Sequence, residues 1–143
     1  VLKENMSLSL RYGNIFSIII IDIDFFKKIN DNFGHQVGDD VLKECSYILS
    51  QNIRNVDTLG RWGGEEFLVV CPETLKDGAK DLAIKLNKAI KLHKFSTYPH
   101  SVTISVGVAS CSVNDLNYDD IISNADKALY EAKNNGRDRV EIF

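Results

Sequence analysis

The sequence predicts a mixed α/β (α+β) protein with a ferredoxin-like central sheet that is flanked by helices. Residues 15–22 form a continuous, largely β-branched apolar run, which is typical of a strand buried on both faces of a sheet. The rest of the chain alternates strand-like runs with helical spacing, in the order helix, hairpin, helix, strand, helix, strand. Together these segments contain the β-α-β-β-α-β arrangement of ferredoxin-like folds, with further elements added.

Each predicted element follows from its own apolar spacing and from the residues that end it. Gly63 and Gly64 separate two short strand-like runs and predict a hairpin turn, and Asn135 with Gly136 ends the last helix. The predicted strands cover residues 15–22, 58–61, 66–71, 101–113 and 140–143. The predicted helices cover residues 1–12, 41–53, 75–93 and 118–133.

The composition limits the size of the protein and the kind of ligand it suits. A length of 143 residues without an internal linker is typical of one domain, so we expect residues 1–143 to form a single domain. A net charge of −3 argues against a nucleic-acid polymer as partner but leaves room for a local basic pocket for phosphates. A single nucleotide is therefore a more suitable ligand than a duplex.

The cysteines and the apolar runs indicate a cytoplasmic domain that does not insert into a membrane. Cys45, Cys71 and Cys111 form no C-x-x-C pair and have no histidine at zinc-like spacing, so neither a disulfide framework nor a zinc site is expected. The longest apolar run, residues 16–21, is much shorter than the roughly 20 residues that a membrane helix needs.

Four acidic residues are predicted to gather at one end of the sheet. Asp22 and Asp24 lie at the end of the strand at 15–22, and from the alternation of side chains we expect only one of them to face a ligand. The hairpin would bring Glu65 and Glu66 to the same end if it lies beside that strand. Buried carboxylates repel one another unless a cation neutralises them, which predicts a divalent ion such as Mg²⁺ between carboxylates and phosphates. A solvated hairpin and a simple strand end are the alternatives.

Two further segments offer groups that bind phosphates. The backbone N–H groups of Phe25 and Phe26 lie at a predicted strand-to-helix turn, and Lys27 adds positive charge there. Lys133 and Arg137 lie at the end of the last long helix and would bind outer phosphates if they fold back over the site. The predicted ligand is a nucleoside triphosphate. A solvated face for Lys27 and a helix-dipole contact for Lys133 are the alternatives.

Five separated segments carry a resemblance to a known family. They read DIDFFKKINDNFGHQVGDD, RWGGEEF, SVGVA, ADKALYEAK and NGRDRV. In this order and spacing they resemble the GGDEF domain of diguanylate cyclases in its GGEEF variant, over residues 15–143. The resemblance implies a fold similar to the palm of polymerases and to adenylate cyclases. It also implies an enzyme that joins two GTP molecules into cyclic di-GMP, a bacterial second messenger, and releases two pyrophosphates.

The resemblance also implies the roles of the site residues. Asp22, Glu65 and the backbone carbonyl of Ile23 would hold two Mg²⁺ or Mn²⁺ ions in each half-site. Glu66 would either complete the metal site or help to remove the proton of the attacking 3′-hydroxyl, and the sequence leaves both roles open. The phosphates would be held by the backbone N–H groups of Phe25 and Phe26 and by Lys27, Lys133 and Arg137.

Asn30 and Asp39 are implied to recognise the guanine base. The carboxylate of Asp39 can accept hydrogen bonds from N1–H and from the exocyclic N2–H, a pair of donors that adenine lacks. GTP is therefore favoured over ATP as substrate, and a cyclase that makes an adenine-containing dinucleotide is disfavoured. The alternative for both residues is helix capping, for which Asn and Asp are well suited.

Arg54 and Asp57 form an R-x-x-D motif, and five residues separate Asp57 from Gly63. At this place the family has an inhibitory site for cyclic di-GMP, so the resemblance implies inhibition by the product. Arg54 offers a bidentate fork to a phosphate or to guanine O6 and N7, and Asp57 can accept from guanine N–H groups. A surface ion pair between the two residues is the alternative.

The chain departs from the family pattern at its beginning. A D-x-L-T-G-L-x-N-R-like stretch usually precedes the first helix, and the sequence does not contain it. We therefore expect residues 1–143 to lack that N-terminal stretch and the upstream sensor domain, which could tether the full-length protein to a membrane. Because each chain would bind one GTP, the resemblance implies that activity needs a homodimer. The intact acids of the turn favour a cyclase over a catalytically silent module that binds GTP or cyclic di-GMP.

Overall fold

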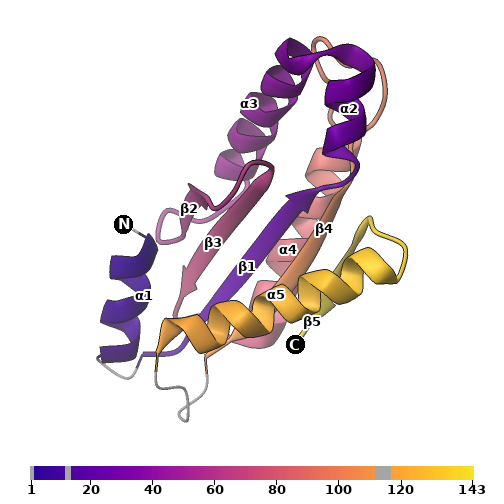
Figure 1. Ribbon diagram of the computed structural model, residues 1–143. Helices are drawn as coiled ribbons and strands as arrows, with labels where there is room; N and C mark the ends of the chain where they lie inside the picture. Colours follow the sequence, from indigo (N-terminus) through magenta and orange to yellow (C-terminus); the bar gives the residue numbers. More distant parts are fainter. Residues whose placement is uncertain (1, 12–13, 112–116) are drawn as a thin grey trace.

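The computed structural model describes residues 2–11, 14–111 and 117–143. Helices pack on both faces of one sheet (Figure 1), and an additional helix lies between the first strand and the helix predicted at 41–53. In chain order the elements are α1 (Leu2–Arg11), β1 (Phe16–Ile23), α2 (Phe26–Phe33), α3 (His35–Gln51), β2 (Thr58–Arg61), β3 (Glu66–Pro72), α4 (Lys76–Leu92), β4 (Ile104–Ser110), α5 (Tyr118–Asn134) and β5 (Arg139–Ile142).

The strands form a mixed five-stranded sheet in the order β2-β3-β1-β4-β5. β1 pairs antiparallel with β3 and with β4, and β5 pairs parallel with β4. The first four strands thus have the ferredoxin-like arrangement, and β5 extends it at the β4 edge. β1 lies in the centre of the sheet, which explains why all 8 of its residues are buried.

The two faces of the sheet carry separate hydrophobic cores. Odd-numbered β1 residues such as Ile19 and Ile21 pack with α3 and α4, whereas even-numbered ones such as Ile18 and Ile20 pack with α1 and α5. This alternation decides which face each side chain at the end of β1 occupies. Within the described ranges, no helix has the length and apolar character that crossing a membrane requires.

The segment after β1 differs from the prediction. Residues 26–33 form a separate helix, α2, and α3 begins at His35 rather than at Val41. Gly34, with a φ of 92°, separates the two helices. The sequence does place Phe26, Ile29 and Phe33 at helical spacing, a signal that the prediction overlooked in a segment of only 8 residues. At the start of α3, residues 35–40 contain a single apolar side chain, Val37, so apolar periodicity is weak there.

The strand predicted at 101–113 is shorter in the structure. Ile104 pairs with Ile23, the last residue of β1, so no strand partner is available for residues 101–103. β4 ends at Ser110, and residues 112 and 113 of the prediction lie outside the described residues, as do residues 1 and 12 of the predicted first helix. The other predicted elements agree with the structure to within two residues at each end.

β4 and α5 approach so closely at Gly107 that a side chain has no room. A Cβ atom there would lie 2.2 Å from the backbone oxygen of Ala125 and 2.4 Å from the backbone nitrogen of Leu129. We predict that Gly107→Ala lowers the free energy of unfolding by about 3 kcal/mol, because the helix backbone must move away from the sheet. Urea denaturation measures the loss.

Gly60→Ala in β2 is the matched control. The nearest neighbours of its added Cβ atom are side-chain atoms of Leu2, which can change rotamer. This variant should lose less than about 1 kcal/mol. Equal losses in the two variants would contradict the close approach of β4 and α5.

Candidate active site

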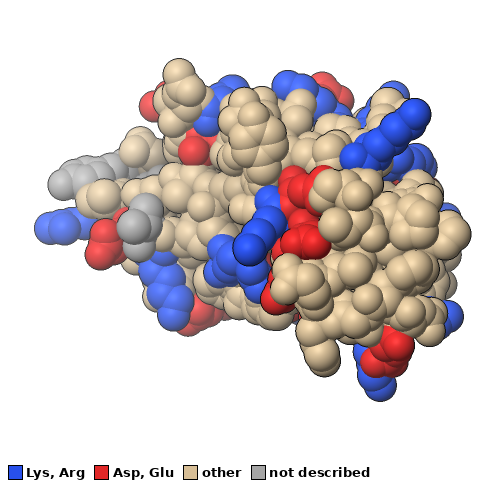
Figure 2. All heavy atoms as spheres, turned by 90° about the horizontal axis from the view of Figure 1, so that it is seen from above, with Lys and Arg blue, Asp and Glu red and all other residues tan. Residues whose placement is uncertain are grey.

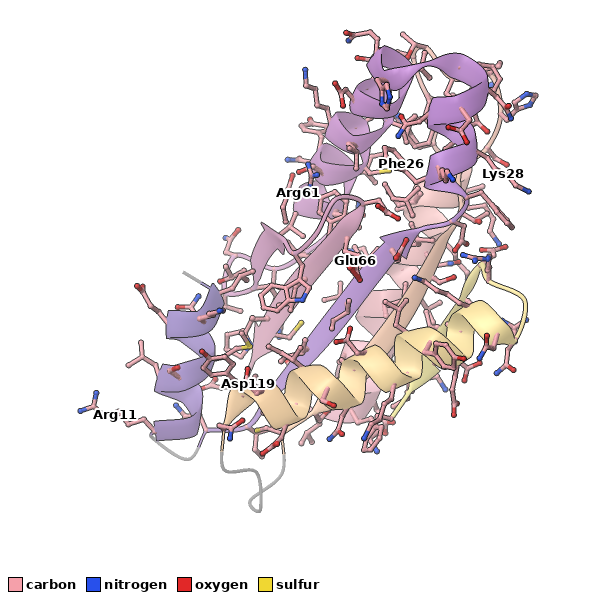
Figure 3. All side chains as sticks on the ribbon, viewed as in Figure 1. Arg11, Phe26, Lys28, Arg61, Glu66 and Asp119 are labelled. Carbon is pink, nitrogen blue, oxygen red and sulfur yellow. The ribbon has the colours of Figure 1, made fainter. Side chains whose placement is uncertain are left out.

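Two carboxylates face the same side of the sheet at the end of β1. Asp22 and Glu66 are direct cross-strand partners in the β1–β3 register, which places their Cβ atoms about 5 Å apart. Both continue the even-numbered positions that pack under α5, so both side chains lie on the α5 face. Figure 3 shows Glu66 beside β1, far from Asp119 at the opposite end of α5. The prediction that the hairpin brings its acids to the end of β1 is therefore confirmed for Glu66.

Lys133 supplies positive charge to this pair from the last turns of α5. Its Nζ atom donates to Oδ2 of Asp22 at 2.7 Å, and the Asp22 side chain is only 7% exposed. Burial raises the pKa of Asp22 above its usual range, and the hydrogen bond from Lys133 opposes this only in part. Burial and the negative charge of Asp22 likewise raise the pKa of Glu66. The site thus concentrates more negative charge than one lysine compensates.

The glycine turn is held in place by backbone contacts. The guanidinium of Arg61 donates to the carbonyl of Gly63 at 3.4 Å and to that of Gly64. The carbonyl of Glu65 accepts from the backbone N–H of Ile23 at 3.2 Å. The two backbones at Ile23 and Glu65, both predicted to contribute to a metal site, are therefore adjacent.

The N-terminus of α2 lies directly after β1 and leaves its first N–H groups available. Phe25 precedes the helix in a left-handed conformation with a φ of 57°, and its side chain makes no capping hydrogen bond. The guanidinium of Arg137 lies 4.9 Å from the centre of the Phe25 ring, so the end of α5 does fold back over this turn as predicted. Lys27 is exposed in the first turn of α2. Figure 2 shows acidic and basic side chains in contact near the middle of the face seen from above.

Asp24 serves the fold rather than facing a ligand. Its Oδ1 accepts from the hydroxyl of Ser105 at 2.6 Å, and its Oδ2 accepts from the hydroxyl of Thr103 at 2.7 Å and from the backbone N–H of Asp138 at 2.9 Å. Of Asp22 and Asp24, only Asp22 is thus available to a ligand, as predicted. The predicted reason, the alternation of side chains, is wrong, because residues two positions apart share a face of a strand. The hydrogen bonds of Asp24 separate the roles of the two residues.

Asn30 and Asp39 lie where α2 and α3 meet. A Cβ atom at Gly38 would lie 1.8 Å from Oδ1 of Asn30, so the Asn30 side chain occupies the space that this glycine leaves. The residue preceding α2 is Phe25 and the residue preceding α3 is Gly34, so neither Asn30 nor Asp39 is a helix N-cap. Asp39 is exposed in the first turns of α3.

Arg54 and Asp57 form an ion pair at the end of β2 and β3 that lies opposite the glycine turn. Arg54 donates to both Asp57 oxygens, at 2.8 Å from Nη2 and 3.2 Å from Nε. The Asp57 side chain is fully buried, whereas that of Arg54 is 53% exposed and also donates to the hydroxyl of Thr74. The hydrogen bonds that Arg54 donates to the carboxylate of Asp57 raise the pKa of Arg54. The pair therefore presents a fixed guanidinium to solvent, with Asp57 behind it.

The residues at the end of β1 fit a divalent cation that a phosphate helps to bind. In the described part of the chain, no three His, Cys, Asp or Glu side chains are grouped to hold a metal by themselves. Asp22 and Glu66 offer hard carboxylate oxygens, and Mg²⁺ typically uses one or two carboxylates together with substrate phosphates. The excess negative charge at this pair favours a cation in the same place.

A comparison with protein families decides the classification. The family described as diguanylate cyclase, GGDEF domain, matches residues 1–139. The chain belongs to the GGDEF domain family. The GGDEF assignment agrees with the Gly63–Phe67 sequence, which reads GGEEF.

Relatives of this GGDEF domain include named cyclases and a response regulator. Diguanylate cyclase A of Treponema denticola is 44% identical over 128 residues, which are 88% of this chain and 34% of that protein. The response regulator PleD of Caulobacter vibrioides is 40% identical over 133 residues, which are 90% of this chain and 29% of that protein. The GGDEF domain thus spans about a third of the length of these curated relatives.

Solved structures share the fold across the whole GGDEF domain. The active GGEEF domain of a diguanylate cyclase from Vibrio cholerae superposes with a TM-score of 0.91 at 36% identity, and the match covers 99% of this chain and 90% of that one. The GGDEF domain of DgcB from Caulobacter crescentus, in complex with c-di-GMP, gives a TM-score of 0.90 at 25% identity, covering 99% of this chain and 85% of that one.

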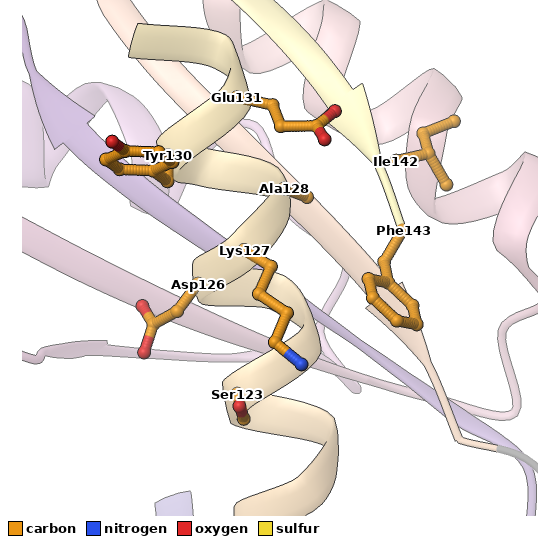
Figure 4. Close-up of a pocket in the computed structure, with 8 residues that line it drawn as sticks. All are labelled: Ser123, Asp126, Lys127, Ala128, Tyr130, Glu131, Ile142 and Phe143. Atoms are coloured by element: carbon orange, nitrogen blue, oxygen red, sulfur yellow. The ribbon is translucent and has the colours of Figure 1, made fainter. Parts of the chain in front are cut away.

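Asp126 is a site neighbour that sequence reasoning missed. Its negative charge contributes to the raised pKa of Glu66, after burial and Asp22. Asp126 and Lys133 are seven residues apart and so share one face of α5, a spacing from which the sequence could have identified it. A cavity of about 640 Å³ lies between α5 and the end of β5, where Lys127 and Phe143 face each other (Figure 4). Asp126 and Tyr130 are also among the residues that line it.

The charge excess gives a stability prediction for the GGDEF domain without metal. We predict that Glu66→Gln raises the free energy of unfolding at pH 7 by about 0.5–1 kcal/mol, because it removes a partly buried charge beside Asp22 and solvent screens part of the repulsion. Thermal unfolding in buffer with a metal chelator measures the change. Glu131→Gln, an exposed position of α5, is the control and should leave the midpoint unchanged. A loss of stability in Glu66→Gln would mean that the folded state favours the charge.

Proposed function

We propose that this GGDEF domain is one half-site of a diguanylate cyclase that joins two GTP molecules into cyclic di-GMP. The observation that supports this most is the cross-strand pair Asp22 and Glu66, which lies next to the N-terminus of α2 and in contact with Lys133. Several relatives are named diguanylate cyclases. The pair provides acidic oxygens where a triphosphate and its cation would meet.

The proposed reaction consists of two successive nucleotidyl transfers. In each, the 3′-oxygen of one GTP forms a bond to the α-phosphorus of the other GTP. The bond from that phosphorus to the oxygen bridging to the β-phosphate breaks, and pyrophosphate leaves. Glu66, the cross-strand partner of Asp22, would either complete the metal site or accept the proton of the 3′-hydroxyl.

The divalent cations would be two Mg²⁺ or Mn²⁺ ions in each half-site. They would be held by Asp22, Glu65, Glu66 and the backbone carbonyl of Ile23. Such ions, when bound, polarise the α-phosphate and lower the pKa of the attacking hydroxyl. The protein's own contribution is to hold these oxygens on a rigid central strand and its neighbouring turn.

The remaining groups would hold GTP itself. We propose that the backbone N–H groups of Phe25 and Phe26 and the side chain of Lys27 bind the phosphates, with Lys133 and Arg137 at the outer ones. Asn30 and Asp39 would accept and donate hydrogen bonds at the guanine edge, between α2 and α3. Neither residue is a helix N-cap, so helix capping does not compete with this role.

Two copies of the domain would face each other for the reaction. One chain has one set of these residues, whereas the product joins two nucleotides, so each GTP would be held by its own chain. We propose that homodimerisation is required for activity. In the full-length protein, an upstream sensor domain would control this dimerisation.

We predict that the domain converts GTP to cyclic di-GMP with Mg²⁺, and that Asp22→Ala or Glu66→Ala reduces the rate by about 10²–10³-fold, because each removes an oxygen that stabilises developing charge. The measurement is chromatographic separation of products at high protein concentration, also with a dimerising helix fused to the chain. Asp119→Ala, at the opposite end of α5, is the control and should retain activity.

Two outcomes would contradict this proposal. An Asp22→Ala protein with most of its activity would exclude the acidic pair as the centre of the reaction. GTP binding without product, even in the forced dimer, would indicate a silent binding module instead.

We further propose that cyclic di-GMP inhibits the enzyme at Arg54 and Asp57. The Nε and Nη2 atoms of Arg54 donate to the buried Asp57, and Nη2 also donates to Thr74, which leaves Nη1 to donate to a phosphate or to guanine O6 and N7. Asp57 would act mainly by orienting Arg54, because its own carboxylate is already used.

For this site, we predict that Arg54→Ala raises the cyclic di-GMP concentration needed for half-inhibition at least about tenfold, because a charge-assisted hydrogen bond is lost. The test is a titration of cyclic di-GMP into the turnover assay. Lys43→Ala, an exposed cation of α3, serves as the control and should keep the inhibition. Unchanged inhibition in Arg54→Ala would remove the regulatory proposal.

A further inference from the structure

The turn between α5 and β5 has an unusual backbone. Two consecutive residues that are not glycine, Arg137 and Asp138, have positive φ values of 64° and 47°, and they follow Gly136 with a φ of 118°. Such conformations cost energy in residues with a Cβ atom and persist only where the surroundings determine them. The contacts of Asp138 therefore identify what holds Arg137 in place.

Helix α4 binds the Asp138 carboxylate from two positions one helical turn apart. Nδ2 of Asn87 donates to Oδ1 at 3.2 Å, and Nζ of Lys91 contacts Oδ2 at 2.6 Å. Asn87 is only 9% exposed, and its amide also donates to the carbonyl of Ile104 at 3.1 Å. The two amide hydrogens of one buried asparagine thus connect α4 to β4 and to the turn.

The backbone of Asp138 is bound by Asp24, which follows β1. The N–H of Asp138 donates to Oδ2 of Asp24 at 2.9 Å, and Asp24 is 3% exposed. Nη1 of Arg137 lies 3.8 Å from the other oxygen of Asp24. Its guanidinium lies over the ring of Phe25 at the start of α2. Asp138 therefore joins α4 to the turn where Arg137 approaches the proposed phosphate site.

We propose that Asp138 is a positioning residue for triphosphate binding, whose side-chain contacts with α4 hold the guanidinium of Arg137 at the N-terminus of α2. This inference rests on the proposed function, because it takes Arg137 to be a ligand of the outer phosphates. Asp138 itself touches no substrate. A purely structural role would destabilise the domain without changing which nucleotide it binds.

The experiment compares a ligand that has the outer phosphates with one that lacks them. Binding of 3′-deoxy-GTP with Mg²⁺, which has no 3′-hydroxyl and cannot be turned over, is measured by calorimetry. GMP binding is measured by competition. The variants are Asp138→Gly, Asp138→Asn and Arg137→Ala, together with the double variant that combines Asp138→Gly and Arg137→Ala.

Asp138→Gly removes the carboxylate but permits the positive φ, so it separates the side-chain contacts from the backbone conformation. We expect it to weaken 3′-deoxy-GTP binding about tenfold and to leave GMP binding unchanged. Asp138→Asn retains the acceptor for Asn87 and tolerates a positive φ, so it should stay within about threefold of the wild type. In the Arg137→Ala background, Asp138→Gly should have no further effect, because the two changes act through one group.

Ile90→Val on α4 is the control for general destabilisation. Ile90 is buried in the core, and its aliphatic side chain takes no part in the hydrogen bonds of Asp138. It should lower the thermal midpoint without changing the ratio of the two affinities. Asn87→Ala is a second test from the α4 side and should reproduce the loss specific to the triphosphate.

Equal weakening of both ligands, additive effects with Arg137→Ala, or wild-type affinities in Asp138→Gly would each overturn the inference while leaving the proposed function intact. A wild-type domain that binds GMP and 3′-deoxy-GTP equally well would overturn the role of Arg137 and the inference with it. A wild-type domain that binds neither nucleotide would overturn the proposed function as well.

Discussion

The close approach of two carboxylates, the buried Asp22 and the half-buried Glu66, is the constraint around which this end of the molecule is organised. Direct cross-strand pairing on one face brings their charges together, and burial raises the pKa of both. Like charges directly opposite each other in a sheet are unfavourable, so the arrangement needs cations. Lys133 supplies one in the protein itself, and a ligand with its divalent ion would supply the rest.

The central position of β1 explains how so many groups meet at this point. Its flanking strands bring the glycine turn from one side and Thr103 and Ser105 from the other. The end of β1 then leads directly into α2, whose N-terminal N–H groups favour anions. Helix α5 crosses the same face, so its last turn places Lys133, and the turn that follows it places Arg137, beside groups that are more than 100 residues earlier in the chain.

Sequence patterns predicted the strands and most helices because buried elements repeat apolar residues at a regular spacing. They missed α2, where Phe26, Ile29 and Phe33 do have helical spacing but over only 8 residues, and the start of α3, where polar residues give no such repeat. For the site, Asp22, Glu66 and Lys133 were predicted and do meet. The roles of Asp24 and Asp138 were not predictable, because their carboxylates bind partners that the local sequence does not indicate.

The sequence by itself determined the family of this GGDEF domain, the central buried strand and the acids that follow it, because these depend on local composition and motif spacing. Only the tertiary structure decided which acid faces the site and which is used for support. That choice depends on long-range hydrogen bonds, such as those from Thr103, Ser105 and the Asp138 backbone to Asp24. Two aspartates two residues apart thus have different roles because folding brings different donors to each.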